Sequence, residues 1–222
     1  MLTILTAVEV RVLGSLIEKQ VTTPEYYPLT LNALTLACNQ KNNRSPVTAY
    51  TETTVAEAVE SLRAKNLTYV FYGSNSRVPK YKHVMAEIFH LSHPELSLMC
   101  VLMLRGAQTV GELHGRSARL YDFRGLEEVE ETLGLLIAKD PEPLVIRLPR
   151  QPGQKETRFA HLLAGEINLE SIAAEFQSPK DVGAGRQATG ERISHLEQEV
   201  ERLSEEMQSL QRQFEEFKKQ FE

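Results

Sequence analysis

Tryptophan is absent from this sequence, and cysteine occurs only twice, as Cys38 and Cys100. The two cysteines are far apart and stand among apolar residues, which favours buried free thiols in a reducing compartment over a disulfide or a metal site. No stretch approaches the roughly 18 uncharged apolar residues that cross a bilayer. The first residues carry no basic stretch and no small-residue cleavage site, so we expect no secretion signal. These absences predict a cytoplasmic protein with no membrane partner.

Motifs that bind nucleotides, metals or acyl groups are missing as well. The sequence has no G-x-x-x-x-G-K-[ST], G-x-G-x-x-G, H-E-x-x-H, C-x-x-C or G-x-S-x-G. His90 and His93 could share a helix face with Glu87, but Pro94 disturbs that geometry and a solvated linker is the favoured interpretation. We therefore expect no metal, no cofactor and no enzymatic activity.

Charge is unevenly spread along the chain, whose net charge is −5. Residues 1–84 carry 9 Lys or Arg and 6 Asp or Glu, a balance of +3. Residues 85–165 carry 9 and 11, a balance of −2, and residues 166–222 carry 7 and 13, a balance of −6. The acidity therefore lies mostly in the C-terminal part, and the N-terminal third is mildly basic.

Three helices and a hairpin are expected in the first 85 residues. Thr6 with Glu9 forms a capping box before a helical apolar face, and a second helix covers residues 31–38. A third helix is expected from Thr54 with Glu57 in its first turn. Strands at 68–72 and 79–84 then close the unit. This order is typical of a winged helix.

The same order returns in residues 86–167. Helices are expected from Ser92, from Thr109 and around residues 126–136, followed by strands at 144–148 and 157–161. The two hairpins also end alike, in Lys80-Tyr-Lys-His and Arg158-Phe-Ala-His. We therefore predict a mainly α fold with small β-hairpins, built as two tandem winged-helix domains at 1–85 and 86–167.

A C-terminal coiled-coil helix is expected at 191–222, after a linker at 168–190 whose Pro, Gly, Ala and Gln show no periodicity. Apolar residues alternate spacings of three and four, which is a heptad pattern. They are Ile193, Leu196, Val200, Leu203, Met207, Leu210, Phe214 and Phe217. The pattern predicts a homodimer, and a single amphipathic helix that folds back on its own chain is the alternative.

A family resemblance rests on several long motifs. They are the run from Arg11 to Asn32, the loop Ala37-Cys-Asn-Gln-Lys-Asn-Asn-Arg-Ser-Pro-Val, the segment Leu104-Arg-Gly-Ala-Gln-Thr-Val-Gly-Glu-Leu, and the hairpin from Pro152 to His161. Over residues 3–167 the chain resembles the YceH-like family of uncharacterised bacterial proteins. The resemblance implies a tandem winged-helix fold and a bacterial cytoplasmic protein. It implies no activity and no site residues.

Basic and amide side chains near the third helix of the first unit suggest a double-stranded DNA contact, because phosphates attract Lys and Arg and amides can donate to phosphates or base edges. The candidate residues are Lys41, Asn42, Asn43, Arg44, Arg77, Lys80 and Lys82. An ordinary mixed surface with turn-forming asparagines explains the same residues. We expect a DNA-associated regulatory protein that binds through its first winged helix.

Acidic third helices oppose that expectation. The first carries Glu52, Glu57 and Glu60, and the second has four acids, which are Glu127, Glu128, Glu130 and Glu131. Carboxylates facing a polyanion are repelled, so the second helix is not expected in a major groove. The second unit has arginines before this helix and on its hairpin, so a contact with phosphates through the loop or the hairpin remains open. A protein–protein adaptor, which docks a protein partner on the acidic second-domain helix, is the alternative function.

Overall fold

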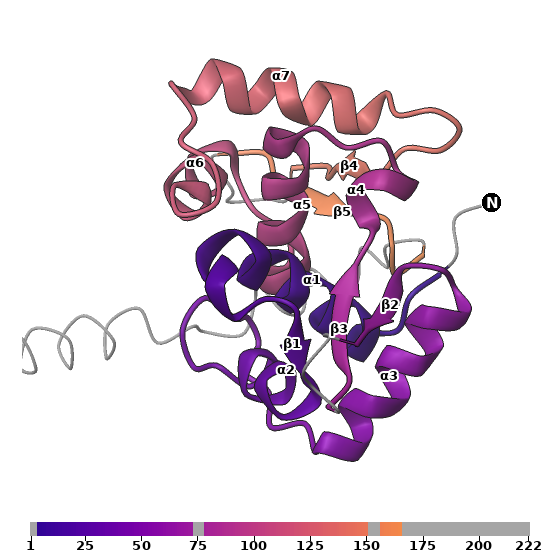
Figure 1. Cartoon of the computed structure of the whole chain (residues 1–222). Helices are drawn as coiled ribbons and strands as arrows, with labels where there is room; N and C mark the ends of the chain where they lie inside the picture. Colours follow the sequence, from indigo (N-terminus) through magenta and orange to yellow (C-terminus); the bar gives the residue numbers. More distant parts are fainter. Residues whose placement is uncertain (1–3, 73–77, 151–155, 166–222) are drawn as a thin grey trace, which may run out of the picture. The chain divides into compact units, whose positions relative to one another are not determined.

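The computed structural model describes residues 4–72, 78–150 and 156–165. All of them fall in one compact unit that spans Met1–Ile167. The expected linker at 168–190, the coiled-coil helix at 191–222 with its apolar seam, and Arg77 lie outside the described residues. The described part is mainly helical, with two small antiparallel sheets, as the sequence predicted (Figure 1).

The N-terminal half contains the elements expected from the sequence and two short additions. Its helices are α1 (Ala7–Thr22), α2 (Leu31–Cys38) and α3 (Glu52–Ala64), with the 3-10 turn η1 (Pro24–Tyr26). Its strands are β1 (Leu29–Thr30), β2 (Thr68–Phe71) and β3 (Lys80–His83), which form one antiparallel sheet in the order β1-β3-β2. The turn η1 and strand β1 are the parts that the sequence analysis missed, because two or three residues carry no periodic pattern.

Side-chain caps explain where these helices begin. Glu9 Oε2 accepts from the Thr6 backbone N–H at 2.6 Å and Thr6 Oγ1 accepts from the Glu9 N–H at 3.2 Å, which is the predicted capping box. The start expected for α3 at Thr54 was wrong. Thr51 is the N-cap, and its Oγ1 accepts from the Thr54 N–H at 3.1 Å, so the helix begins at Glu52.

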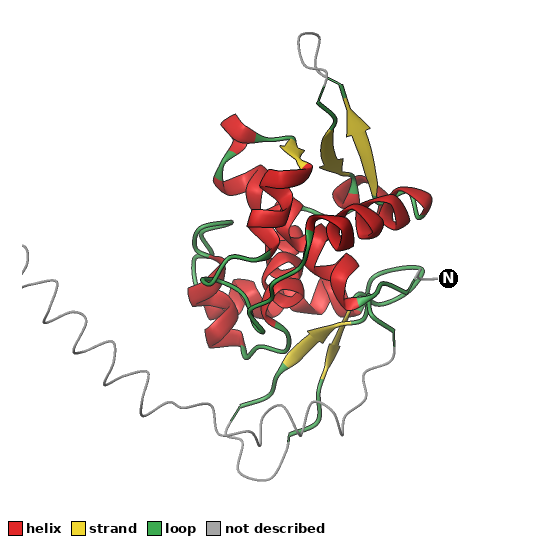
Figure 2. Ribbon diagram, turned by 90° about the horizontal axis from the view of Figure 1, so that it is seen from below, coloured by secondary structure: helices red, strands yellow, loops and turns green. Residues whose placement is uncertain are grey.

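The second half repeats the order of the first. It contains α5 (His93–Arg105), α6 (Val110–Ser117) and α7 (Leu126–Ile137), followed by the antiparallel pair β4 (Val145–Arg147) and β5 (Phe159–His161). The short helix α4 (Met85–Ile88) precedes them and was not predicted from the sequence. The sheet of this half is separate from the first one (Figure 2). A backbone bridge between Gln108 and Phe159 stands where β1 pairs with β3 in the first half. The repeat therefore extends to the strand position before the second helix.

Helix α5 packs against α1 of the first half and against α6 and α7 of its own half. One hydrophobic cluster runs through both halves and includes Leu13, Leu16, Leu102 and Leu133. Gly14 allows the close approach of α1 to α5, because a Cβ atom there would lie 3.0 Å from Leu104 Cδ2. The two repeats thus share a buried core.

Within the described parts of the chain, no helix combines the length and the apolar character that a membrane crossing requires. Cys38 and Cys100 are buried free thiols, as predicted. Burial raises the pKa of Cys38 to about 11 and raises the pKa of Cys100 further. Both therefore pack as small apolar groups rather than as reactive thiolates.

Candidate functional site

The outward face of the N-terminal sheet alternates aromatic and basic side chains. In the antiparallel register Tyr69 pairs with Lys82 and Phe71 pairs with Lys80, so all four side chains lie on one face. Tyr69 is 39% and Phe71 is 44% exposed, and the two lysines are partly exposed. Lys82 Nζ lies 5.8 Å from the centroid of the Tyr69 ring, within the range of a cation–π contact. We call these four residues the sheet face.

The opposite face of the same sheet is anchored in the core. Tyr81 and His83 are buried, and the His83 backbone N–H donates to the Tyr27 hydroxyl at 2.9 Å. His83 Nδ1 accepts from the Met85 N–H at 3.3 Å. Burial lowers the pKa of His83 to about 4, with a smaller contribution from the positive charge of Lys82. A neutral, buried histidine therefore fixes the strand that carries both lysines.

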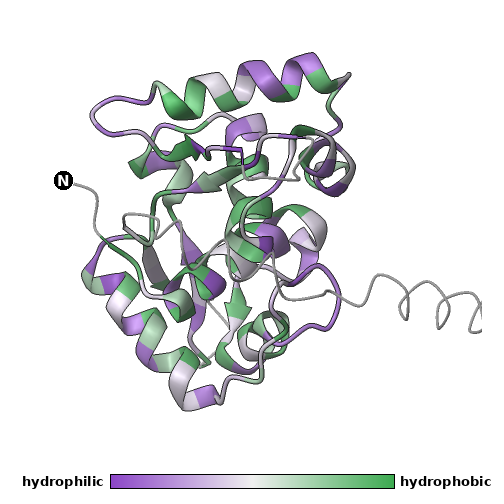
Figure 3. Ribbon diagram, turned by 180° about the vertical axis from the view of Figure 1, so that it is seen from behind, coloured by the Kyte–Doolittle hydropathy of each residue, from purple (hydrophilic) through white to green (hydrophobic). Residues whose placement is uncertain are grey.

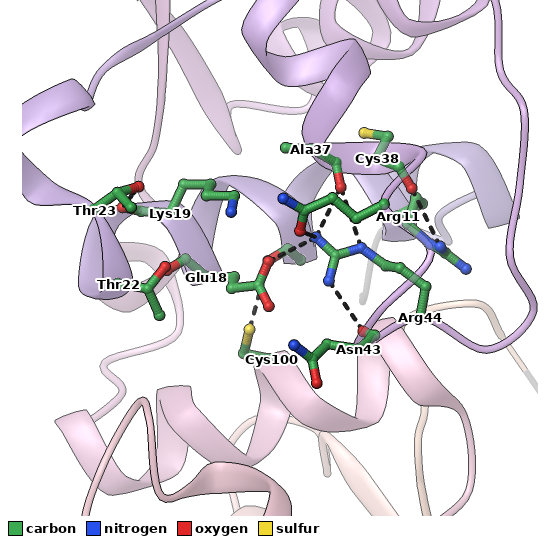
Figure 4. Close-up of polar contacts among 12 residues, drawn as sticks. Arg11, Glu18, Lys19, Thr22, Thr23, Ala37, Cys38, Asn43, Arg44 and Cys100 are labelled. Carbon is green, nitrogen blue, oxygen red and sulfur yellow. Dashed lines mark hydrogen bonds and ion pairs between the residues drawn. The ribbon is translucent and has the colours of Figure 1, made fainter. Parts of the chain in front are cut away.

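Arg44 occupies a different place from the one predicted. Its side chain is buried, and Nη2 pairs with Glu18 Oε2 of α1 at 2.6 Å and donates to the Ala37 carbonyl at 2.8 Å (Figure 4). Burial acts to raise the pKa of Glu18, but the hydrogen bonds and charge of Arg44 and a hydrogen bond from Arg119 lower it overall. Arg44 therefore holds the loop before α3 to α1, and its assignment to an exposed phosphate contact was wrong.

The rest of that loop also folds onto the protein. Asn43 has a φ of 60°, and its Oδ1 accepts a hydrogen bond from Arg105 at the end of α5. Asn39 Nδ2 donates to the Tyr50 carbonyl and its Oδ1 accepts from the Tyr50 N–H, both at 2.8 Å. Lys41 and Asn42 remain exposed. Of the seven predicted residues, the structure brings Lys80 and Lys82 together and keeps Lys41 and Asn42 at the surface.

Carboxylates dominate the outward faces of both third helices. On α3, Glu52, Glu57 and Glu60 are exposed, and Glu60 Oε2 holds Arg63 in an ion pair of 2.6 Å. On α7, Glu127, Glu130 and Glu131 are exposed beside exposed apolar residues, and Figure 3 shows hydrophilic and hydrophobic positions along this helix. These apolar residues are Leu126, Leu135 and Ile137. Neither outward face offers a polyanion a net positive surface.

Tyr69 and Phe71 were missed in the sequence analysis, although the signal was present. The strand at residues 68–71 alternates outward and inward positions, as does the strand from Lys80 to His83. An antiparallel hairpin therefore places its outward residues opposite one another. Applying this rule to both strands would have assigned the two aromatic residues to the same face as the lysines.

These observations define a mainly helical protein with two small antiparallel sheets and an internal structural repeat. The chain belongs to the family described as protein of unknown function, DUF480, whose model matches residues 5–154. Its relatives include a UPF0502 protein of Opitutus terrae, 52% identical over 80% of this chain and 77% of the relative. Another UPF0502 protein, from Geotalea uraniireducens, is 54% identical over 86% of each chain, and one from Vibrio campbellii is 45% identical over 88% and 89%. The predicted resemblance to the YceH-like bacterial family is confirmed.

Proposed function

We propose that this protein is a non-enzymatic, DNA-associated regulatory protein of the cytoplasm, built from two winged-helix units. The repeated order of three helices and a hairpin supports the winged-helix assignment. In this proposal the hairpin of the N-terminal unit contacts the nucleic acid, and the third helices stay out of the groove. The observation that carries the proposal is the sheet face, which joins Lys80 and Lys82 with Tyr69 and Phe71.

The chemistry of the sheet face suits a nucleic acid for two separate reasons. Lysine ammonium groups neutralise phosphates and release counterions, which makes such binding strongly dependent on salt. Aromatic rings stack on bases wherever a base is unstacked or a strand is open. The exposed carboxylates of α3 oppose insertion of that helix into a major groove, so a contact led by the hairpin agrees better with the charges.

Charge reversal on the sheet face tests the proposal. In the full chain, Lys80→Glu with Lys82→Glu is expected to weaken binding to a fluorescent DNA duplex by about 10-fold or more at low salt. Fluorescence anisotropy over a salt series measures both the affinity and the salt slope. The slope is expected to fall because fewer counterions are released.

A matched control lies on the second hairpin, where Arg147→Glu with Arg150→Glu makes the same change of charge. Both side chains are exposed. The control is expected to keep most of the affinity. Equal affinity of the wild type and the Lys80 and Lys82 variant, with both folded by circular dichroism, contradicts the proposal. An equal loss in the control would show that net charge, rather than the sheet face, governs binding.

A protein–protein adaptor is the second candidate function, and the outward face of α7 favours it. Exposed acidic residues lie there on the same helix as exposed Leu126, Leu135 and Ile137. Such a face is complementary to a partner that combines basic and apolar residues. We further propose that the coiled-coil helix at 191–222 joins two copies of the chain, which would multiply either kind of weak contact.

A further inference from the structure

Four arginine side chains converge where the two halves meet. Arg44 comes from the loop before α3, Arg105 is the last residue of α5, Arg116 lies on α6, and Arg119 follows the end of α6. Arg105 Nη2 donates to Asn43 Oδ1, and Arg44 Nη1 donates to the Asn43 carbonyl at 3.0 Å. We call the four arginines the arginine cluster.

Glu18 links the two sides of the cluster through both of its carboxylate oxygens. Its Oε2 pairs with Arg44 Nη2 at 2.6 Å, and its Oε1 pairs with Arg119 Nη2 at 2.7 Å. Glu112 is divided between Arg116, at 3.5 Å, and Arg158, at 2.7 Å. The carboxylates near the cluster are therefore already in use.

Arg105 has no carboxylate of its own. Among the described residues, no Asp or Glu oxygen lies within 4.0 Å of its guanidinium, and its partner is a neutral amide oxygen. Burial lowers the pKa of Arg105, and the positive charges of Arg116, Arg119 and Arg44 lower it further, against the opposing effect of Glu18. Four cations therefore share Glu18 and part of the charge of Glu112, which is an unfavourable arrangement without a further negative charge.

Solvent can reach the cluster from the α6 side. The side chain of Arg119 is 50% exposed and that of Arg116 is 34% exposed, whereas Arg44 is fully enclosed and forms the inner boundary. The loop that carries Asn43 also presents exposed Lys41 and Asn42. An anion can therefore approach the outer arginines without any rearrangement of the core.

We infer that the arginine cluster binds a small phosphate-bearing anion at the seam between the two halves. Guanidinium groups are planar forks of N–H donors that match phosphate oxygens in pairs, and such charge-assisted bonds are stronger than neutral ones. The bound anion supplies the missing negative charge beside Arg105. It contacts residues of both halves, so it links the loop before α3 to α5 and α6. This site shares no residue with the sheet face and goes beyond the proposed function.

Calorimetric titration of the full chain tests the inference, with inorganic phosphate and pyrophosphate as probes in a buffer without other multivalent anions. Saturable binding of one pyrophosphate per chain is expected. Arg105→Gln and Arg116→Gln are each expected to weaken it by about 10-fold or more, since each removes a charge-assisted contact. Arg63→Gln is the control, because Arg63 is an exposed arginine held by Glu60 on α3. Unchanged affinity in both cluster variants, or an equal loss in the control, overturns the inference.

Thermal unfolding separates loss of binding from loss of fold. Pyrophosphate is expected to raise the Tm of the wild type, because a ligand that binds only the folded state stabilises it. Arg105→Gln without anion is expected to melt at or above the wild-type Tm, because repulsion within the cluster is relieved. Absence of both heat and a Tm increase at millimolar pyrophosphate overturns the inference.

A short DNA duplex distinguishes a free anion from a nucleic-acid backbone, which carries the same phosphate chemistry. If the cluster binds a small free anion, the duplex is expected not to displace pyrophosphate. Duplex binding that depends on Arg105 and Arg116, with no pyrophosphate binding, overturns the small-anion assignment. If the Lys80 and Lys82 variant loses duplex binding but still binds pyrophosphate, the small-anion site at the arginine cluster is supported, and the loss concerns only the sheet face.

Discussion

At the residue scale, a histidine ends the last strand of each hairpin, the buried His83 on β3 and the half-buried His161 on β5. His83 Nε2 and His161 Nδ1 are enclosed without a hydrogen-bond partner among the described residues. Burial lowers the pKa of each to about 4 from an ordinary value of 6.5. The folded protein therefore holds both rings neutral at a pH where the unfolded chain already binds protons.

Acidification is predicted to destabilise the fold through these two histidines. Because both pKa values are lower in the folded protein than in the unfolded chain, the unfolded chain binds protons first as the pH falls. The free energy of unfolding is therefore highest above pH 6.5 and decreases as the pH falls towards 4. Between pH 7.5 and pH 5 each histidine costs about 2 kcal/mol of unfolding free energy. Urea unfolding at the two pH values measures this difference.

Single substitutions assign the effect of pH to these residues. His83→Gln and His161→Gln are each expected to reduce the difference between pH 7.5 and pH 5. The exposed His90 provides the control, and His90→Gln is expected to keep the wild-type difference. Glu18 has a lowered pKa, so it becomes protonated only at a pH below this range. It therefore does not contribute to the difference in stability between pH 7.5 and pH 5. An unchanged difference in both the His83 and the His161 variant contradicts the prediction.

Single residues were the least predictable level of the structure. Arg44 and Lys80 have the same charge, but Arg44 is buried against Glu18, 26 residues away in the chain. That ion pair depends on how α1 meets the loop, which no local pattern encodes. Lys80 and Lys82 could be placed because alternation along a strand is a local rule.

At the scale of elements, the contact between α1 and α5 holds the two repeats together. Gly14 of α1 faces Leu104 and Met103 of α5, and Cys100 Sγ donates to the Gly14 carbonyl at 3.5 Å. A side chain at position 14 would meet Leu104 Cγ at 3.1 Å and Met103 Cβ at 3.2 Å from its first carbon alone. The helices can pack this closely only because position 14 has no side chain.

Gly14→Val is therefore predicted to destabilise the protein by about 1–3 kcal/mol, the usual cost of overpacking a close contact. Gly134→Val on α7 is the matched control, since a Cβ atom there meets nothing within 4 Å. The control is expected to be neutral or slightly stabilising, because valine has a better helix propensity than glycine. Chemical denaturation of both variants measures the two effects. Equal stability of the variants would mean that α1 and α5 are not tightly packed at this point.

Helices and hairpins were the most predictable level of the fold. Caps such as Thr6 with Glu9 and apolar spacing along the helices are local signals, and both predict these elements from the sequence alone. The start of α3 was misplaced because Thr51 and Thr54 are both good capping residues three positions apart. Deciding between them required the path of the preceding loop, which depends on Asn39 and Tyr50.

At the scale of the whole molecule, the repeat combines two halves whose surfaces differ. The first half presents the sheet face, and the second presents the acidic face of α7. The shared core between them places the arginine cluster at the seam. Sequence comparison of the two halves predicted the duplication, but the seam could not be predicted, since it joins Arg105 and Arg119 to residues more than 60 positions earlier.

Removal of the proposed coiled coil distinguishes the two candidate functions. A chain that ends at Gly190 is predicted to have half the solution mass of the full chain by light scattering, if residues 191–222 pair two copies. Affinity for a DNA duplex is then expected to fall by about 10- to 100-fold, because two linked weak contacts become one, but to remain measurable. Full-length Leu196→Glu with Leu203→Glu is the control that breaks the apolar seam without shortening the chain. If both proteins keep the full-length mass, the tail is not the dimerisation element. If duplex binding is unaffected while capture of a protein partner is lost, the adaptor function is favoured.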